Sequence, residues 1–236
     1  MSTHLFLDFD GTISNGDIGD ELFRTFGSFE PVHSQLIAGD FSVAEYYRQS
    51  VALLRSDCTP EAIVEFCDGQ SLDAGFAPLV DWCASVDIAV TVVSDGFDAY
   101  ISPLLKKSGL RDQLKVICNV LEWNDEKFTP SFPGASESCT CFCASCKRNA
   151  VINRIGDQDI AIYVGDGRSD ACAVEYADVV FAKSSLAAEC TRKGIPHHPY
   201  RTLSEVRIIL QEKVGKGALR TRRQAQLARK RAFEAE

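Results

Sequence analysis

Short apolar runs alternate with helical patterns along most of the chain. Five runs are apolar without alternation, as is typical of strands buried on both faces of a parallel sheet: 4–9, 88–93, 114–118, 160–164 and 178–182. The spacing of apolar residues predicts helices that follow or separate them, at 97–108, 146–155, 170–176, 185–193 and 203–213. Strands that alternate with helices predict an α/β fold with a doubly wound, mostly parallel sheet.

The segment after the first strand breaks this rhythm, because it holds four or five helical patterns and no strand. Thr59 followed by Pro60 marks the start of one of these helices. We therefore expect a core domain, a helical cap inserted into it, and a basic C-terminal tail that is helical by propensity and exposed to solvent. The expected boundaries are 1–13 and 86–213 for the core, 14–85 for the cap and 214–236 for the tail.

Charged residues are unevenly distributed along the chain, and their distribution limits the classes of partner that the protein can bind. The formal net charge is −8, yet from residue 213 onward eight Lys and Arg stand against two Glu. The rest of the chain is therefore strongly acidic, which argues against nucleic acid as a partner. No apolar run approaches the roughly 18 residues of a membrane span, so we expect no membrane partner.

The N-terminus has no basic segment followed by an apolar one, as a secretory signal would have. We therefore expect a cytoplasmic protein whose ten cysteines are mostly reduced thiols.

Acidic and hydroxyl side chains follow three of the predicted strands. Asp8 and Asp10 follow the first strand, Ser94 the second, and Asp166 and Asp170 the fourth. In an open α/β sheet, ligands bind just beyond the carboxyl ends of the strands. Four carboxylates gathered there would repel one another unless a divalent cation lay among them, and such oxygen ligands suit Mg²⁺. The sequence thus predicts a magnesium site formed by these four aspartates.

Four segments, in this order, resemble the motifs of the haloacid dehalogenase (HAD) superfamily. They are D-F-D-G-T at 8–12, Ser94 after a buried strand, Lys147 at a helix start, and G-D-G-R-S-D at 165–170. The helical insert resembles the type I cap of the phosphoserine phosphatases in this superfamily. The resemblance covers about residues 3–185 and implies a Rossmann-like core. It also implies a Mg²⁺-dependent phosphatase that acts on a small phosphorylated metabolite through an aspartyl phosphate.

The resemblance assigns a role to each acidic residue. Asp8 would be the nucleophile that becomes phosphorylated, and Asp10 the general acid that protonates the leaving group and then activates water. Their spacing of two residues lets both side chains lean to the same side of a strand end. Asp166 would bind Mg²⁺ with the Asp8 carboxylate and the Asp10 backbone carbonyl. Asp170 would hold a metal-bound water or orient Lys147.

The transferring phosphoryl group would be bound by a second set of residues. By the same resemblance these are the side chains of Thr12, Ser94 and Lys147 and the backbone N–H groups of Asp95 and Gly96. Glycine at position 96 lets the backbone approach a ligand closely, and the following helix offers free N–H donors.

One cap residue is a candidate for substrate specificity. Asp17 lies nine residues after Asp8, where the phosphoserine phosphatases carry a Glu that contacts the amino group of the substrate. Asp17 can equally be the N-cap of the first cap helix. Arg24, Arg48 and Arg55 are candidates for binding a substrate carboxylate.

A cysteine-rich segment precedes Lys147. Cys139, Cys141, Cys143 and Cys146 are spaced closely enough to bind a soft metal such as Zn²⁺. Packed free thiols, and a redox-active or disulfide role, are the alternatives, and the sequence leaves all of them open.

The same segment bears on the substrate. Together with H-H-P-Y at 197–200, it resembles the methionine-salvage enolic phosphatases, whose substrate is 2-hydroxy-3-keto-5-methylthiopentenyl 1-phosphate. The segment and the Ser94-Asp95-Gly96 sequence also resemble the phosphoethanolamine/phosphocholine phosphatases. Phosphoserine hydrolysis, phosphoryl transfer to an alcohol, and a metal- or thiol-binding module with a vestigial site also remain open.

Overall fold

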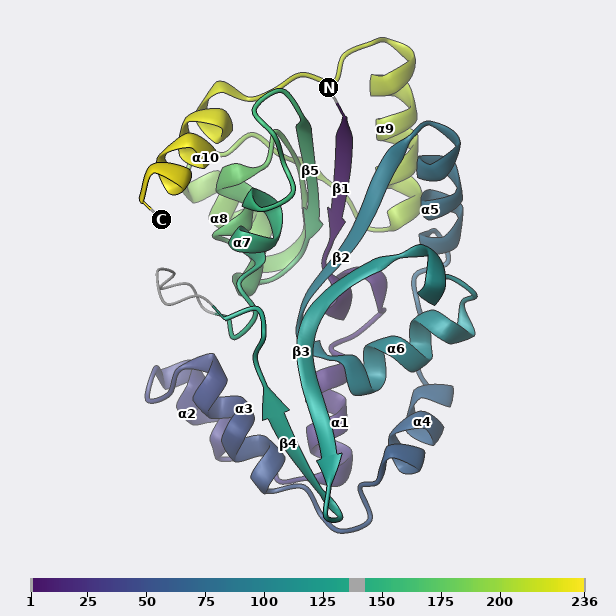
Figure 1. Ribbon diagram of the computed structural model, residues 1–236, viewed down its shortest axis with the longest axis vertical. Helices are drawn as coiled ribbons and strands as arrows, with labels where there is room; N and C mark the ends of the chain where they lie inside the picture. Colours follow the sequence, from purple (N-terminus) through teal and green to yellow (C-terminus); the bar gives the residue numbers. More distant parts are fainter. Residues whose placement is uncertain (1, 136–142, 236) are drawn as a thin grey trace.

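A mixed sheet lies at the centre of the protein (Figure 1). The computed structural model describes residues 2–135 and 143–235, and within them seven strands form one sheet in the order β4-β3-β2-β1-β5-β6-β7. The strands are β1 (Thr3–Leu7), β2 (Ile88–Phe97), β3 (Lys115–Asn124), β4 (Lys127–Ser131), β5 (Ile160–Gly165), β6 (Val179–Ala182) and β7 (His198–Pro199). Neighbours are parallel except for β3 and β4. The strand order changes direction at β1, so the residues after β1 lie at the switch point where such sheets bind ligands.

The α/β sheet predicted from the apolar runs is confirmed, with two strands missed. All five predicted strands are present with shifted ends, and β4 and β7 are additional. Strand β4 returns antiparallel to β3 through Asp125 and Glu126, whose φ angles are +48° and +59°. Such hairpin turns normally contain Asn-Gly or Asp-Gly. The hairpin was missed because this turn has no glycine.

Both faces of the sheet are covered by helices (Figure 1). Along β1, Leu5 and Leu7 belong to one apolar cluster and Phe6 to the other, because successive side chains of a strand point to opposite faces. The first face carries α5 (Phe76–Ser85), α6 (Asp98–Lys107) and α9 (Leu203–Gly215), and the second carries α7 (Lys147–Ile152) and α8 (Ser184–Arg192). No helix of the described residues combines the length and apolar character needed to cross a bilayer.

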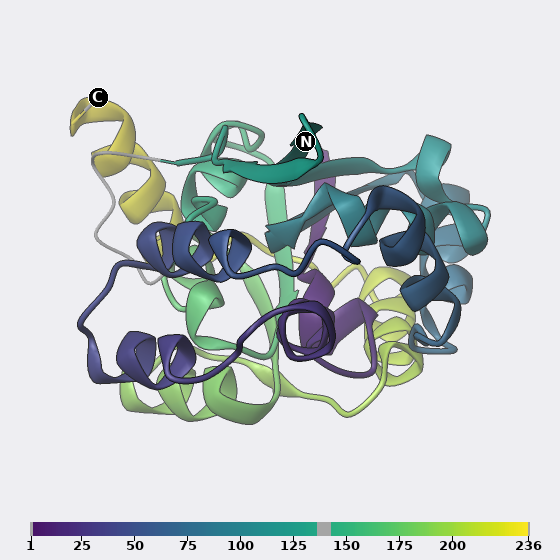
Figure 2. The same cartoon turned by 90° about the horizontal axis from the view of Figure 1, so that it is seen from below.

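A group of helices stands at the end of the sheet where β1 stops (Figures 1 and 2). They are α1 (Ile18–Phe26), α2 (Val32–Ala38), α3 (Val43–Ala52) and α4 (Pro60–Asp68), and we call them the cap helices. Helix α4 begins as expected, since the Thr59 hydroxyl accepts the N–H of Ala62. Helix α5 fell within the predicted insert of residues 14–85, but it packs against β2 and α9. The exact boundary between cap and core stays a prediction.

The continuous helix predicted at 170–176 is wrong. The chain forms two short 3₁₀ helices there instead, η3 (Arg168–Asp170) and η4 (Ala173–Tyr176). In a continuous helix, backbone carbonyls accept hydrogen bonds from the backbone of the same helix. Here the Arg222 side chain donates instead to the carbonyls of Val174, Glu175 and Ala177.

The basic tail is exposed to solvent over part of its surface only, although it was expected to be exposed throughout. Its helix α10 (Arg223–Ala235) packs against η4, and Ala225 is fully buried. Arg229 is 4% exposed; it donates to the Tyr176 carbonyl at 2.6 Å and pairs with Asp178 at 3.1 Å. The backbone N–H of Arg222 donates to the same Asp178 carboxylate at 2.7 Å. The tail is therefore attached to the loop after β5 by buried, charged hydrogen bonds.

Arg229→Met should destabilise the protein because it leaves the buried Asp178 carboxylate without its ionic partner. We expect the free energy of unfolding in urea to fall by about 3 kcal/mol. Arg231→Met is the matched control, since Arg231 lies exposed on the same helix, and it should change stability by less than about 0.5 kcal/mol. Equal stability of the two variants would show that the buried pair contributes nothing.

Candidate active site

Lys147 joins two of the predicted aspartates at the switch point of the sheet. Its ammonium donates to Asp8 Oδ1 at 2.6 Å and to Asp170 Oδ1 at 2.7 Å. These three side chains are at most 6% exposed. Burial alone would lower the pKa of Lys147, but Asp170 and Asp8 together raise that pKa well above its ordinary value. The two carboxylates therefore favour the charged form of the lysine beside the end of β1.

Asp170 is held by donors on both of its oxygens. Besides Lys147, the Tyr163 hydroxyl donates to Oδ1 at 2.7 Å. The backbone N–H groups of Asp166 and Gly167 donate to Oδ2, each at 3.0 Å. The carboxylate thus contacts the lysine and shapes the loop after β5. Which of the two expected roles it has stays a prediction.

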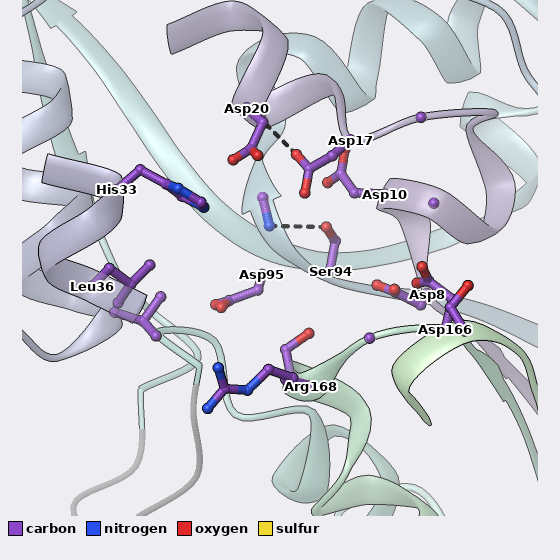
Figure 3. A pocket seen from close by; sticks show the side chains of 18 of the residues that line it. Asp8, Asp10, Asp17, Asp20, His33, Leu36, Ser94, Asp95, Asp166 and Arg168 are labelled. Atoms are coloured by element: carbon purple, nitrogen blue, oxygen red, sulfur yellow. Dashed lines mark hydrogen bonds between the residues drawn. The ribbon is translucent and has the colours of Figure 1, made fainter. Parts of the chain in front are cut away.

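Asp8, Asp166 and Asp170 form the one acidic cluster of metal-ligand geometry among the described residues. Their carboxylate oxygens lie within 4.8 Å of one another, and Asp8 and Asp166 are neighbours in Figure 3. Burial and the charge of Asp170 raise the pKa of both Asp8 and Asp166. A hard divalent cation would relieve this repulsion, so the donor set fits Mg²⁺.

Two neighbouring residues let Asp166 come close to the end of β1. Gly11 has a φ of +72°, and a Cβ there would lie 2.5 Å from Asp166 Oδ2. The Thr12 hydroxyl donates to Asp166 Oδ1 at 3.3 Å and also contacts the Tyr200 hydroxyl. Thr12 is 1% exposed and does not line the cavity described below. In this arrangement it positions Asp166, and its predicted contact with phosphate stays a prediction.

Asp10 points away from the Lys147 cluster toward the cap. Its Oδ1 accepts the N–H of Ile18 at 3.0 Å, and its Oδ2 accepts the hydroxyl of Tyr100 at 2.7 Å. Burial, and secondarily the charge of Asp17, raise the pKa of Asp10 to about 7. A carboxyl group with such a pKa can release and take up a proton near neutral pH, as a general acid and base must.

The end of β2 lies beside the carboxylates and brings Ser94, Asp95 and Gly96 to the cavity. The Gly96 N–H donates to Ser94 Oγ at 2.9 Å, as the dashed line in Figure 3 shows. A Cβ on residue 96 would overlap the Tyr100 hydroxyl. Glycine at this position therefore makes room for the Tyr100 side chain, a role that no pattern in the sequence indicates.

Asp95 fastens the segment that leads into Lys147. Its Oδ1 accepts the N–H groups of Ala144 and Ser145, each at 2.7 Å. The Asn119 amide donates to the Asp95 carbonyl at 2.5 Å. Burial raises the pKa of Asp95 to about 6, although these hydrogen bonds oppose the rise. The side chain thus ties the end of β2 to the residues just before α7.

A cavity of about 600 Å³ connects these groups with the cap. Its core side holds Asp8, Asp10, Ser94, Lys147 and Asp166. Its cap side is part acidic and part apolar, with Asp17, Asp20, Phe23, His33, Leu36, Ile37, Val43, Tyr46 and Tyr47. The four phosphatase-like motifs therefore meet at one cavity.

Asp17 is an N-cap and also borders the cavity. Its Oδ1 accepts the N–H of Asp20 at 2.8 Å, so it is the N-cap of α1. Its carboxylate also borders the cavity (Figure 3). A role in substrate recognition is therefore compatible with the capping role but stays a prediction.

The three candidate carboxylate-binding arginines do not line the cavity. Arg24, Arg48 and Arg55 form exposed ion pairs with acidic neighbours. Arg168 borders the cavity instead, from the loop after β5 (Figure 3).

The predicted metal or thiol site is only partly described. Cys139 and Cys141 lie outside the described residues, whereas Cys143 is partly buried and Cys146 is buried. Both described cysteines have contacts within the protein. A metal at this site stays a prediction.

Two buried tyrosines at the site were missed from the sequence. Tyr163 contacts Asp170, and Tyr100 contacts Asp10. A signal existed for Tyr163, because a tyrosine in an otherwise apolar buried strand needs a partner for its hydroxyl. Tyr100 carried no such signal, since its distance from Asp10 along the chain is 90 residues.

The sequence is similar to named phosphatases. The profile of the haloacid dehalogenase-like hydrolases matches residues 5–175. The 2-hydroxy-3-keto-5-methylthiopentenyl-1-phosphate phosphatase of Bacillus cytotoxicus is 30% identical over 217 residues, covering 91% of this chain and 98% of its own. The protein of the same name from Brevibacillus brevis is 30% identical over 211 residues, covering 88% of this chain and 95% of its own.

Solved structures share the fold. A phosphoserine phosphatase, solved as an analogue of its phospho-aspartyl intermediate, gives a TM-score of 0.65 at 22% identity, covering 89% of this chain and 98% of that one. A probable phosphoserine phosphatase from Vibrio cholerae, in its unliganded form, gives 0.67 at 20% identity, covering 94% of this chain and 68% of that one.

Asp95→Ala should loosen the segment before α7 because two buried N–H groups lose a charged acceptor. We expect amide hydrogen exchange at Ala144 and Ser145 to become at least about tenfold faster, since a hydrogen bond to a charged group contributes roughly 1.5–3 kcal/mol. Asp112→Ala is the control, because Asp112 is exposed, and it should leave both rates unchanged. Unaltered exchange in Asp95→Ala would contradict the anchoring role.

Proposed function

This chain belongs to the haloacid dehalogenase-like hydrolases and is a phosphoric monoester hydrolase, and we propose that it works with Mg²⁺ through an aspartyl phosphate on Asp8. The observation that carries the proposal is the meeting of Asp8, Asp10, Lys147 and Asp166 at one cavity. These residues come from three motifs that lie far apart in the sequence: Asp8 and Asp10 from the first, Lys147 from another, and Asp166 from the last.

The metal would be held by side chains that already lie together. Asp8 and Asp166 would bind it through their carboxylates, and Asp10 through its backbone carbonyl. Asp170 would support the site by orienting Lys147 and the loop that carries Asp166. A bound Mg²⁺ neutralises charge on the carboxylates and on the transferring phosphoryl group.

In the first half of the reaction, a carboxylate oxygen of Asp8 attacks phosphorus and the bond from phosphorus to the leaving oxygen breaks. Asp10, protonated at this stage, gives its proton to that oxygen, so an alcohol or enol departs. Lys147 and Ser94 lie beside Asp8 and donate to the phosphoryl oxygens. In the second half, Asp10 takes a proton from water, the water oxygen attacks phosphorus, and inorganic phosphate leaves Asp8.

For the substrate we favour 2-hydroxy-3-keto-5-methylthiopentenyl 1-phosphate. The named relatives at 30% identity support it, as they match this chain over nearly their whole length. The apolar part of the cavity supports it as well. Phe23, Leu36, Val43 and Tyr46 offer a surface against which a methylthio group can pack.

A second class of substrate is favoured by a different observation. Asp17 and Asp20 place two carboxylates on the cap side of the cavity. An ammonium group on the substrate, as in phosphoserine, phosphoethanolamine or phosphocholine, would be attracted to them.

Asp8→Asn should abolish turnover while leaving the fold intact, because the amide keeps the shape of the side chain but is not a nucleophile. We expect kcat to fall by at least about a thousandfold, as when other nucleophiles are removed. Phosphate release measures the loss, and thermal unfolding checks the fold. Retention of full activity would be incompatible with an aspartyl phosphate at this position.

Chelation of divalent metal should also stop the reaction. We expect the chelator-treated protein to release no phosphate and to recover on addition of Mg²⁺, because the clustered carboxylates then regain their counter-charge. Undiminished turnover after chelation would rule out the proposed metal dependence.

Asp17→Asn separates the two substrate classes, since asparagine caps a helix as well as aspartate does but carries no charge. With the enolic phosphate we expect the highest kcat/KM of any phosphate tested. In the variant this value should change only through the lower pKa of Asp10 that follows from loss of the Asp17 charge, an effect that every substrate shares. For an ammonium-bearing substrate the variant should lose at least about tenfold, given the strength of charged hydrogen bonds. If phosphoethanolamine or phosphocholine were the best substrate and lost activity in this way, the enolic assignment would be wrong.

A further inference from the structure

The carboxyl group of Asp10 is clamped between the core and the cap. Oδ2 accepts the Tyr100 hydroxyl at 2.7 Å, from α6 in the core. Oδ1 accepts the Ile18 N–H at 3.0 Å, from the first residue of α1 in the cap. With a donor on each oxygen, neither side-chain torsion of Asp10 can rotate without breaking a hydrogen bond. The donor on Oδ2 is the Tyr100 hydroxyl, which a substitution can remove without altering the backbone.

Tyr100 is itself firmly held. It is 1% exposed, and its ring packs on that of Phe9 with the centroids 6.2 Å apart. Its carbonyl accepts the thiol of Cys67 from α4. The missing Cβ of Gly96 leaves the space that the phenol hydroxyl fills. The Tyr100 ring is thus fixed in place, and its hydroxyl reaches Asp10 Oδ2 through the space beside Gly96.

We propose that Tyr100 is a positioning residue, which holds Asp10 where it can protonate the leaving oxygen. The inference rests on the proposed function, because it requires Asp10 to act as the general acid. When the phosphorus–oxygen bond breaks, the proton moves from the carboxyl of Asp10 to the leaving oxygen. The hydroxyl of Tyr100 keeps its own proton throughout and stabilises the carboxylate that remains on Asp10.

This role predicts a loss that depends on the leaving group. A leaving oxygen of high pKa needs a proton as it departs, so it depends on a correctly placed acid. A leaving group that is stable as an anion needs no such proton. Removing the hydroxyl should therefore slow the first kind of ester and spare the second, whereas damage to Asp8, the metal site or the fold should slow both.

Two esters of the same shape provide the comparison: phenyl phosphate and p-nitrophenyl phosphate. Phenol has a pKa of about 10, like tyrosine, and p-nitrophenol is a much stronger acid. Release of the phenol in a single turnover isolates the step that forms the aspartyl phosphate. For Tyr100→Phe we expect the rate to fall about tenfold or more with phenyl phosphate and less than about threefold with p-nitrophenyl phosphate. Tyr176→Phe, outside the cavity, should change neither rate.

A double variant keeps the test valid if Tyr100→Phe also weakens packing. If Tyr100 acts through Asp10, adding Tyr100→Phe to Asp10→Asn should change the phenyl phosphate rate by less than about twofold, since the two residues form one unit. A purely structural role would reduce the rate again in that background.

The outcomes separate the inference from the proposed function. Equal losses with both esters, no loss with either, or a further loss in the Asp10→Asn background would overturn the role of Tyr100 and leave the phosphatase proposal standing. A wild-type protein that is not phosphorylated on Asp8 by either ester would overturn both.

Discussion

The ion cluster of Lys147, Asp8 and Asp170 is the interaction on which the site depends. A buried ammonium is tolerable only if carboxylates surround it, and a buried carboxylate likewise needs its cation. The three residues come from the start of α7, the end of β1 and η3. The two ion pairs therefore join three separate segments at the centre of the sheet. The order of the strands changes direction at the same place.

The same point of the sheet connects the cap to the core. Ala144, three residues before Lys147, packs into the small apolar cluster formed by α2 and α3, and its N–H donates to Asp95 at the end of β2. Asp10 shares its two oxygens between α1 of the cap and α6 of the core. The cavity is thus lined by elements of cap and core that are joined through hydrogen bonds to Asp10 and Asp95.

The loop after β5 is held from two sides. Asp170 organises its beginning by accepting the N–H groups of Asp166 and Gly167. Arg222 and Arg229 secure its end through backbone carbonyls and Asp178. The composition of the basic tail suggested a solvated segment. The tail instead holds the loop that carries Asp166, through the contacts of Arg222 and Arg229. Charge alone does not reveal such a role, because a buried arginine and an exposed one look the same in a sequence.

The sequence by itself determined the parallel sheet and the set of acidic residues at its edge. Apolar runs specify buried strands locally, and parallel strands necessarily bring their carboxyl ends to one side. Only the tertiary structure decided the rest: the glycine-free turn at Asp125, the docking of Arg229 and the clamp of Tyr100 on Asp10. Each of these depends on a partner that is distant in the chain or on a backbone conformation that its residue type does not favour, so no local pattern encodes it.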